Sequence, residues 1–234
     1  MLDAITPPLA GVLLQTGRAG EPAGRRIGLW GLFEQSFDVF TVALVLGSLV
    51  AAGLIVRTVL DVRSRTILPP ESVSRADALL ERGRFGELAT FAEDDASFVG
   101  AVLRPALAAR GSGRSAVREA AEIAASAETA RWFRRIEPLS LIGNLAPLVG
   151  LAGTVWGMIL AFTSLGASGG QAGPEELSVG ISKALFHTLL GLVLAVPCLL
   201  VFGLYRSAVD RVCTRGIAEA SRLAERIAGE ERTP

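Results

Sequence analysis

Four side chains that can hold or pass a proton lie inside long apolar stretches of this sequence. Thr154 lies in an uncharged run, and Lys183, His187 and Thr188 lie at the start of another. Hydroxyl, imidazole and ammonium groups are costly in such surroundings unless a partner or water meets them. Their types therefore indicate a path for an ion or a water chain rather than covalent chemistry.

Each of the two threonines belongs to a stripe of small residues at three- and four-residue spacing. Such a stripe either packs helices closely, with each hydroxyl bonded to its own backbone, or forms an inward face that meets an ion, water or a carboxyl group. Spacing alone leaves both interpretations open. The stripes are Gly143, Ala146, Gly150, Thr154, Gly157 and Ala161, and then Ala184, Thr188, Gly191, Ala195 and Cys198; a helix-packing role is predicted for Gly143, Gly150, Gly153, Gly157, Ala184, Gly191 and Ala195.

Lys183 and His187 are candidates for the same proton pathway, but each has a simpler interpretation. Lys183 can extend its ammonium to the membrane interface. His187, the one histidine of the chain, can be a satisfied hydrogen-bonding group instead of a proton relay. Pro147 and Pro197 interrupt the backbone ladder in both runs, which fits either a kink that opens a cavity or mere tolerance of proline in membranes.

Three segments have the length and apolar character needed to position these groups in a bilayer. The chain has 234 residues, of which 50% are hydrophobic and only 20% charged, and about 20 apolar residues are enough for one helical span. We therefore predict an all-α integral membrane protein. Its membrane helices are expected at 37–56, 138–163 and 184–205. The uncharged run of the second helix is 139–162.

Arginine placement predicts the orientation, because positive charge accumulates on cytoplasmic flanks. Three flanks are arginine-rich, whereas the 164–183 segment has Glu175 and Glu176 and a single positive residue, Lys183. We expect 1–36 and 164–183 outside, 57–137 and 206–234 in the cytoplasm. The arginine-rich flanks contain Arg57, Arg63 and Arg65, then Arg131, Arg134 and Arg135, then Arg206, Arg211 and Arg215; Arg18, Arg25 and Arg26 argue the other way.

The segment from 57 to 137 has the composition of helices. A helix is expected from Ser72 to Glu81, another from Ser97 to Arg110, and a break at 111–113. From Arg114 no glycine interrupts the pattern before the second span, so one helix should run through both. An apolar stripe continues the third span to Ile227. Both spans are thus expected to extend into the cytoplasm.

Composition excludes several classes of function. The formal net charge is zero, so the basic surface of a nucleic-acid-binding protein is missing. Cys198 and Cys213 are too few for a disulfide framework, and no Cys/His cluster suggests a metal site or another cofactor. No nucleophile, base and orienting group converge, so an enzyme is not predicted.

Two motifs resemble the MotA/TolQ/ExbB proton channel family, especially its ExbB/TolQ branch. Residues 146–158 read APLVGLAGTVWGM, and residues 180–192 read GISKALFHTLLGL, followed by Ala195-Val196-Pro197. The resemblance covers about residues 37–225. It implies a bacterial inner-membrane homopentamer around a central pore, which holds a single-span partner of the ExbD/TolR type. That partner's membrane aspartate would carry the proton past Thr154 and Thr188, and a TonB- or TolA-like protein would receive the force.

One residue departs from the family pattern. Where that pattern has a glutamate, four residues before His187, this sequence has Lys183. A role for that acid is therefore not transferred, and His187 is a candidate for part of its polar function.

Three interpretations compete. The first is a proton-driven channel or motor subunit. The second is a passive membrane scaffold or secretion component that uses the small stripes only for packing. A flagellar stator subunit would have four spans and a larger charged cytoplasmic domain, which this chain does not match.

Overall fold

The computed structural model describes residue 31, residues 36–167 and residues 173–229. The expected lead-in at 1–36 therefore lies almost wholly outside the described residues. All regular secondary structure in the described part is helical, as predicted. The helices are α2 (Val39–Asp61), α3 (Ser64–Ile67), α4 (Pro70–Glu81), α5 (Phe85–Asp94), α6 (Phe98–Ala108), α7 (Arg114–Ala167) and α8 (Pro174–Gly229).

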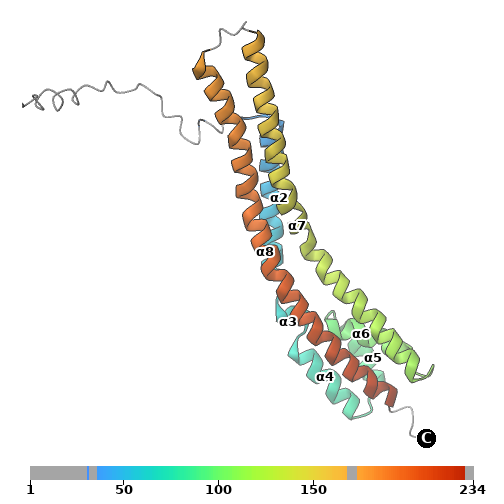
Figure 1. The fold of residues 1–234 in the computed structure, drawn as a ribbon. Helices are drawn as coiled ribbons and strands as arrows, with labels where there is room; N and C mark the ends of the chain where they lie inside the picture. The colour runs from blue at the N-terminus through green and yellow to red at the C-terminus, as the bar shows by residue number, and fades with distance from the viewer. Residues whose placement is uncertain (1–30, 32–35, 168–172, 230–234) are drawn as a thin grey trace, which may run out of the picture.

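Two long helices form the frame of the molecule. α7 has 54 residues and α8 has 56, so each is about 80 Å long at 1.5 Å per residue. They run side by side along the whole molecule and bend together near its middle (Figure 1). The single helix expected to enter the second span from Arg114 is present as α7, and the third span continues without a break to Gly229.

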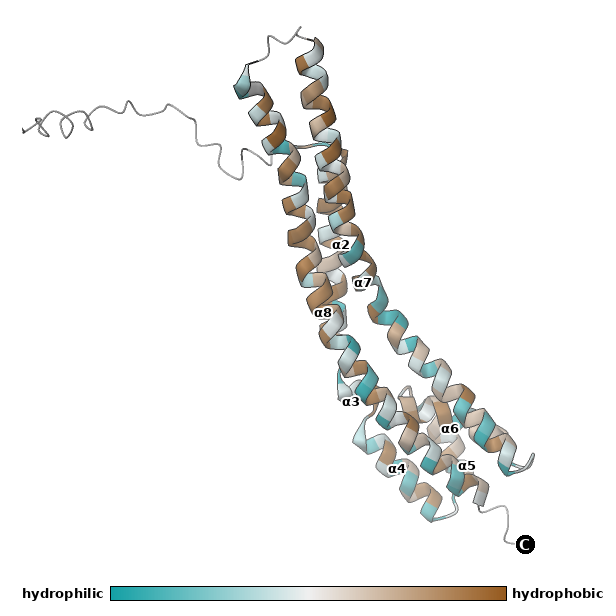
Figure 2. Ribbon diagram, in the orientation of Figure 1, coloured by the Kyte–Doolittle hydropathy of each residue, from teal (hydrophilic) through white to brown (hydrophobic). Residues whose placement is uncertain are grey.

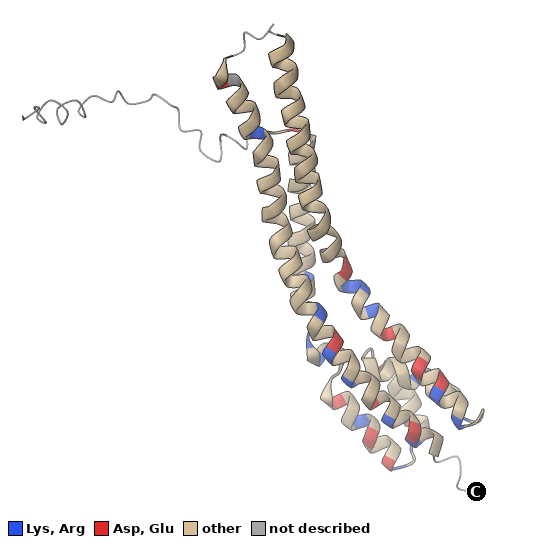
Figure 3. Cartoon of the chain, viewed as in Figure 1, with Lys and Arg blue, Asp and Glu red and all other residues tan. Residues whose placement is uncertain are grey.

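Three helices, α2, α7 and α8, are long and apolar enough to cross a membrane. Their apolar parts lie together in one half of the molecule, and charged residues gather in the other half (Figures 2 and 3). α2 packs along this half of α7 and α8, where its Leu44 and Ala51 are buried with Ala146 of α7 and Leu194 of α8. The prediction of three membrane helices is confirmed.

The charged half is a small helical bundle, which we call the basal bundle: α3–α6 with residues 114–137 of α7 and 206–229 of α8. Its core is a true apolar interior in which Phe98, Leu103, Ile136 and Leu223 are at most 1% exposed. Asp77 of α4 accepts hydrogen bonds from Arg222 and Arg226 of α8. This ion cluster raises the pKa of the Arg222 guanidinium, and the hydrogen bond to Asp77 is the largest cause.

Two sequence-based boundaries are corrected by the structure. α4 begins at Pro70 rather than Ser72, and Pro69 precedes it without a side-chain cap; proline at the first position is compatible with a helix because its missing N–H needs no partner there. The 164–183 segment was expected to be a loop, but α7 continues to Ala167 and α8 begins at Pro174. The two helices therefore extend past the start of α2 (Figure 1).

Candidate functional site

The structure brings Thr154 and Thr188 together between α7 and α8. Their hydroxyl oxygens are in hydrogen-bond contact. Thr154 Oγ1 also lies 3.1 Å from the carbonyl oxygen of Gly150 in its own helix and 3.0 Å from that of Ala184 in α8. Thr188 Oγ1 lies 3.4 Å from the Gly150 carbonyl oxygen. The two hydroxyls and two carbonyls form one compact polar cluster, the threonine pair, inside an apolar interface.

Glycine makes this approach of the two helices possible. A Cβ at Gly150 would lie 2.7 Å from the His187 carbonyl oxygen, and a Cβ at Gly191 would lie 2.6 Å from the Ala146 carbonyl oxygen. At Gly157 it would lie 2.9 Å from Ala184 Cβ. Real Cβ atoms do not approach backbone so closely, so these positions exclude any side chain while the helices keep this distance. The small stripes of the two spans therefore pack against each other within one chain.

The other predicted packing residues lie along the same contact. A Cβ at Gly143 would meet Leu199 at 2.7 Å, and Ala195 is 3% exposed in the apolar core of the spans. Gly153 differs, because its neighbour is the His187 ring, 2.8 Å from the position of a Cβ. Gly153 thus makes room for an imidazole and not for a backbone.

His187 lies at a second polar cluster, where α8 meets the beginning of α2. Its side chain is buried, and its Nε2 lies 2.9 Å from Asp38 Oδ1 and 3.2 Å from Thr41 Oγ1. Thr41 Oγ1 donates its single proton to the Ser36 carbonyl oxygen. Nε2 is therefore best assigned as the N–H that donates to Asp38 Oδ1.

This second cluster, which we call the His187–Asp38 clamp, connects the first span to the third. Asp38 also accepts from the Thr41 N–H at 3.0 Å and so caps α2. Nδ1 of His187 is buried and has no hydrogen-bond partner among the described residues. The clamp thus combines a carboxylate, an imidazole and one ring nitrogen without a partner in a region of the spans that is otherwise apolar.

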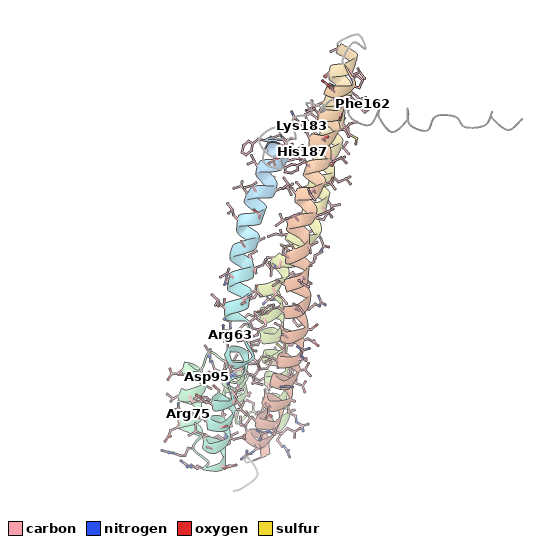
Figure 4. The ribbon with its side chains drawn as sticks, turned by 90° about the vertical axis from the view of Figure 1, so that its left-hand side faces the viewer. Arg63, Arg75, Asp95, Phe162, Lys183 and His187 are labelled. Atoms are coloured by element: carbon pink, nitrogen blue, oxygen red, sulfur yellow. The ribbon has the colours of Figure 1, made fainter. Side chains whose placement is uncertain are left out.

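Lys183 lies one turn before His187 and belongs to neither cluster. It is half-buried on α8, and Figure 4 shows it with His187 near the beginning of α2, while Phe162 lies farther toward the tip of the helix pair. The sequence motifs singled out Lys183 and His187, but they did not reveal Asp38 as the partner of His187. A usable signal was present, because Asp38 is the one acid in the first apolar run and both residues are at the expected outer ends of their spans.

Among the described residues, no group of three or more His, Cys, Asp or Glu side chains is arranged to hold a metal ion. The arrangement offers instead two places where a proton can bind or be passed: the hydroxyls of the threonine pair and the imidazole–carboxylate clamp. Because Thr188 directly follows His187, their side chains project about 100° apart around α8. The hydroxyls therefore face α7, whereas the imidazole lies against Gly153 of α7 and contacts the beginning of α2.

Comparison with known proteins identifies the family. The sequence model for the MotA/TolQ/ExbB proton channel family matches residues 92–216. This range contains Thr154, His187 and Thr188 but not the residues of α2. The chain belongs to the MotA/TolQ/ExbB proton channel family. This confirms the resemblance that the two motifs predicted.

Individual relatives match shorter parts of this family member. A putative biopolymer transport protein ExbB-like 1 of Synechocystis is 42% identical over 87 residues, 36% of this chain and 34% of the relative. The Tol-Pal system protein TolQ of Pseudomonas aeruginosa is 31% identical over 99 residues, 42% of each chain. The biopolymer transport protein exbB1 of Vibrio cholerae is 44% identical over 59 residues, 25% of this chain and 26% of the relative. The matches thus span between a quarter and two fifths of the relatives.

Proposed function

We propose that this chain is the channel-forming subunit of an inner-membrane complex of the ExbB–ExbD or TolQ–TolR type, which converts proton motive force into mechanical work. In this proposal five copies surround a pore that holds a single-span partner with a membrane aspartate. The N-terminal side of the first span lies outside, the basal bundle lies in the cytoplasm, and a TonB- or TolA-like protein receives the force. The family membership supports this function.

The threonine pair is the observation that carries the proposal. Thr154 and Thr188 place two hydroxyls side by side in an interface whose other members are small or apolar. A hydroxyl both donates and accepts, so two in contact can exchange partners when a third group arrives. A protonated or ionised carboxyl group of the partner could therefore replace one of the carbonyl contacts of Thr154 without leaving an unpaired group in the membrane.

The orientation is supported by the distribution of charge. The arginine-rich flanks of all three spans lie at the same end, next to the basal bundle (Figure 3). Positive flanks favour the cytoplasmic side. In this orientation the His187–Asp38 clamp lies near the outer surface, where it can meet protons that enter from outside.

The test is proton flux through proteoliposomes that contain the full chain and its partner. Thr154→Val and Thr188→Val keep the branched shape but remove the hydroxyl, so we expect assembly to persist and flux and energised output to be abolished. Thr163→Val is the matched control, since its exposed hydroxyl only bonds back to the Ile159 carbonyl in the same helix. Thr188→Ser keeps the hydroxyl and should retain flux.

His187 is tested in the same assay. We assign it a part in proton entry, and His187→Ala should lower the flux while the threonine pair remains. Unchanged proton-coupled activity in this variant would limit His187 to clamping α2. Lys183 lies near His187 at the outer end of α8 and stands where the family pattern has a glutamate. If its positive charge acts on entering protons, Lys183→Gln should change the proton flux.

A passive scaffold is the alternative, and one observation favours it. Thr154 and Thr188 are already satisfied by each other and by the Gly150 and Ala184 carbonyls within a single chain. Hydroxyls satisfied in this way can serve packing alone. Normal flux and output in both valine variants would establish this alternative and refute the channel role of the pair.

A further inference from the structure

An apolar groove of about 310 Å³ lies between α2 and α8 inside the membrane spans. Its walls are almost free of polar groups, and Ser48 and Ala52 of α2 and Val193 of α8 are exposed along it. A groove of this kind, open toward lipid, loses dispersion contacts unless hydrocarbon fills it. The lining includes Val45, Ser48, Ala52 and Ile55 from α2 and Val193 and Pro197 from α8.

A second pocket, of about 210 Å³, lies between α8 and the junction of α2 and α3, where the spans pass into the basal bundle. Val62, Ile67 and Val212 form an apolar floor, and Ser64, Arg211 and Arg215 form a polar rim. Figure 3 shows positive residues on α8 and at the junction of α2 and α3, and Figure 4 marks Arg63 at that junction.

The positive charge of this rim is largely unneutralised. Arg211 and Arg215 are exposed and form no ion pair among the described residues. Arg57 pairs with Asp61, the acid at the end of α2. Asp210 is adjacent to Arg211 in sequence but forms no ion pair with it among the described residues. Arg63 and Arg65 are adjacent to Ser64 and add positive charge to this part of the chain. A planar guanidinium pair beside a hydroxyl is well suited to a phosphate.

The two pockets are one leaflet apart along the same seam. Their nearest residues on α8, Cys198 and Ala208, are ten residues apart, which is about 15 Å along the helix. The hydrocarbon of a bilayer is about 30 Å thick, so one leaflet takes up half of that. A molecule with a phosphate at the rim and a chain of one leaflet's length would reach from the basic pocket into the apolar groove.

We propose that the α2–α8 seam is a binding site for one anionic glycerophospholipid. Its phosphate is held by Ser64, Arg211 and Arg215, and one of its acyl chains occupies the apolar groove. A zwitterionic lipid fits less well, because its ammonium group adds a positive charge beside Arg211 and Arg215, which form no ion pair in the described part of the chain. This site is separate from the threonine pair and does not depend on the proposed proton flux.

Native mass spectrometry of the purified full chain in detergent tests the proposal. The chain is titrated with dioleoyl phosphatidylglycerol and, separately, with dioleoyl phosphatidylcholine, and we expect tighter binding of the first. A basic residue near an anionic membrane contributes a factor of about 5, so R211Q/R215Q should weaken phosphatidylglycerol binding about 25-fold. R82Q/R114Q removes the same charge from the end of α4 and the start of α7, which line neither pocket, and should bind as the wild type.

The groove is tested by filling it. Ala52→Phe should remove the bound phosphatidylglycerol at concentrations where the wild type carries it, whereas Ala43→Phe, on an exposed position of α2 that does not line the groove, should not. Inorganic phosphate and glycerophosphoglycerol, which have no acyl chains, should not displace the lipid. Displacement by either, equal binding of the two lipids, or an unchanged R211Q/R215Q affinity would overturn the proposal.

Discussion

Gly191→Ala gives a direct measure of how closely α7 and α8 must approach. A Cβ at this position would lie 2.6 Å from the Ala146 carbonyl oxygen, while ordinary contacts begin at 3.4 Å. The helices must therefore separate locally by about 0.8 Å. If the same separation reaches the threonine pair, the 3.0 Å contact between Thr154 and the Ala184 carbonyl lengthens to about 3.8 Å and is lost as a hydrogen bond.

The cost follows from these two effects. Forcing one methyl group into a packed interface costs about 1–3 kcal/mol, and a lost hydrogen bond adds about 0.5–1.5 kcal/mol. Alanine in place of glycine returns up to about 1 kcal/mol of helix propensity. A control that receives the same propensity without the clash isolates the packing cost. Gly203→Ala serves, because it is also on α8 and has nothing within 4 Å of its Cβ position.

The assay is unfolding of the purified full chain in mixed micelles by increasing sodium dodecyl sulfate, followed by tryptophan fluorescence. Because the control cancels the propensity gain, we expect Gly191→Ala to unfold with a free energy about 1.5–4.5 kcal/mol lower than Gly203→Ala, the sum of the packing and hydrogen-bond costs. A second control, Gly53→Ala on α2, also has open space around it and should match Gly203→Ala. Equal unfolding of all three variants would refute the close α7–α8 contact and the packing role of the small stripes.

Two further predictions concern ionisable groups. Asp38→Asn keeps the cap of α2 but removes the charge that His187 faces. Unfolding in sodium dodecyl sulfate should therefore show a free energy of unfolding about 1 kcal/mol lower than that of the wild type. Asp61→Asn, in an exposed pair, should lower it by less, and equal losses would argue against the clamp. Burial raises the pKa of the Cys213 thiol to about 11, with a further increase from Glu128 and a decrease from the hydrogen bond to Thr129. The thiolate is the reactive form, so at pH 8 alkylation of Cys213 should be about 100-fold slower than that of a cysteine with the ordinary pKa of 9.0, such as an exposed Thr214→Cys. Because the unfolded chain releases this proton first, stability should fall as the pH rises above about 9; rapid labelling of Cys213 at pH 8, measured by mass spectrometry, would contradict its burial.

The sequence predicted the long elements well, because length and hydropathy act locally. Uninterrupted apolar runs identified three spans, and the helix-favouring stretch from Arg114 predicted one continuous α7. Boundaries set by weaker signals were less accurate. The serine at position 72 suggested a cap, but proline at the first helical position started α4 earlier. The polar residues of the 164–183 segment indicate a loop. However, α7 continues into the beginning of this segment, and α8 begins within it at Pro174.

The candidate site was only partly accessible from the sequence. Residue spacing placed Thr154 and Thr188 within stripes of small residues, but a stripe does not say what faces it. That the hydroxyls meet each other depends on the distance and rotation between α7 and α8. The pairing of His187 with Asp38 depends in addition on where α2 lies, and these two residues are 149 positions apart in the chain.

The sequence by itself determined that three helices enter the membrane, because transfer of a long apolar run into lipid is favourable whatever its neighbours are. It also determined where hydroxyl and ionisable groups interrupt those runs, and its motifs identified the family. Tertiary structure alone decided which of these groups touch. Glycines at 150 and 191 let backbones approach to a distance that no other residue allows, and that approach brings Thr154 against Thr188 while Gly153 leaves room for the imidazole that holds Asp38.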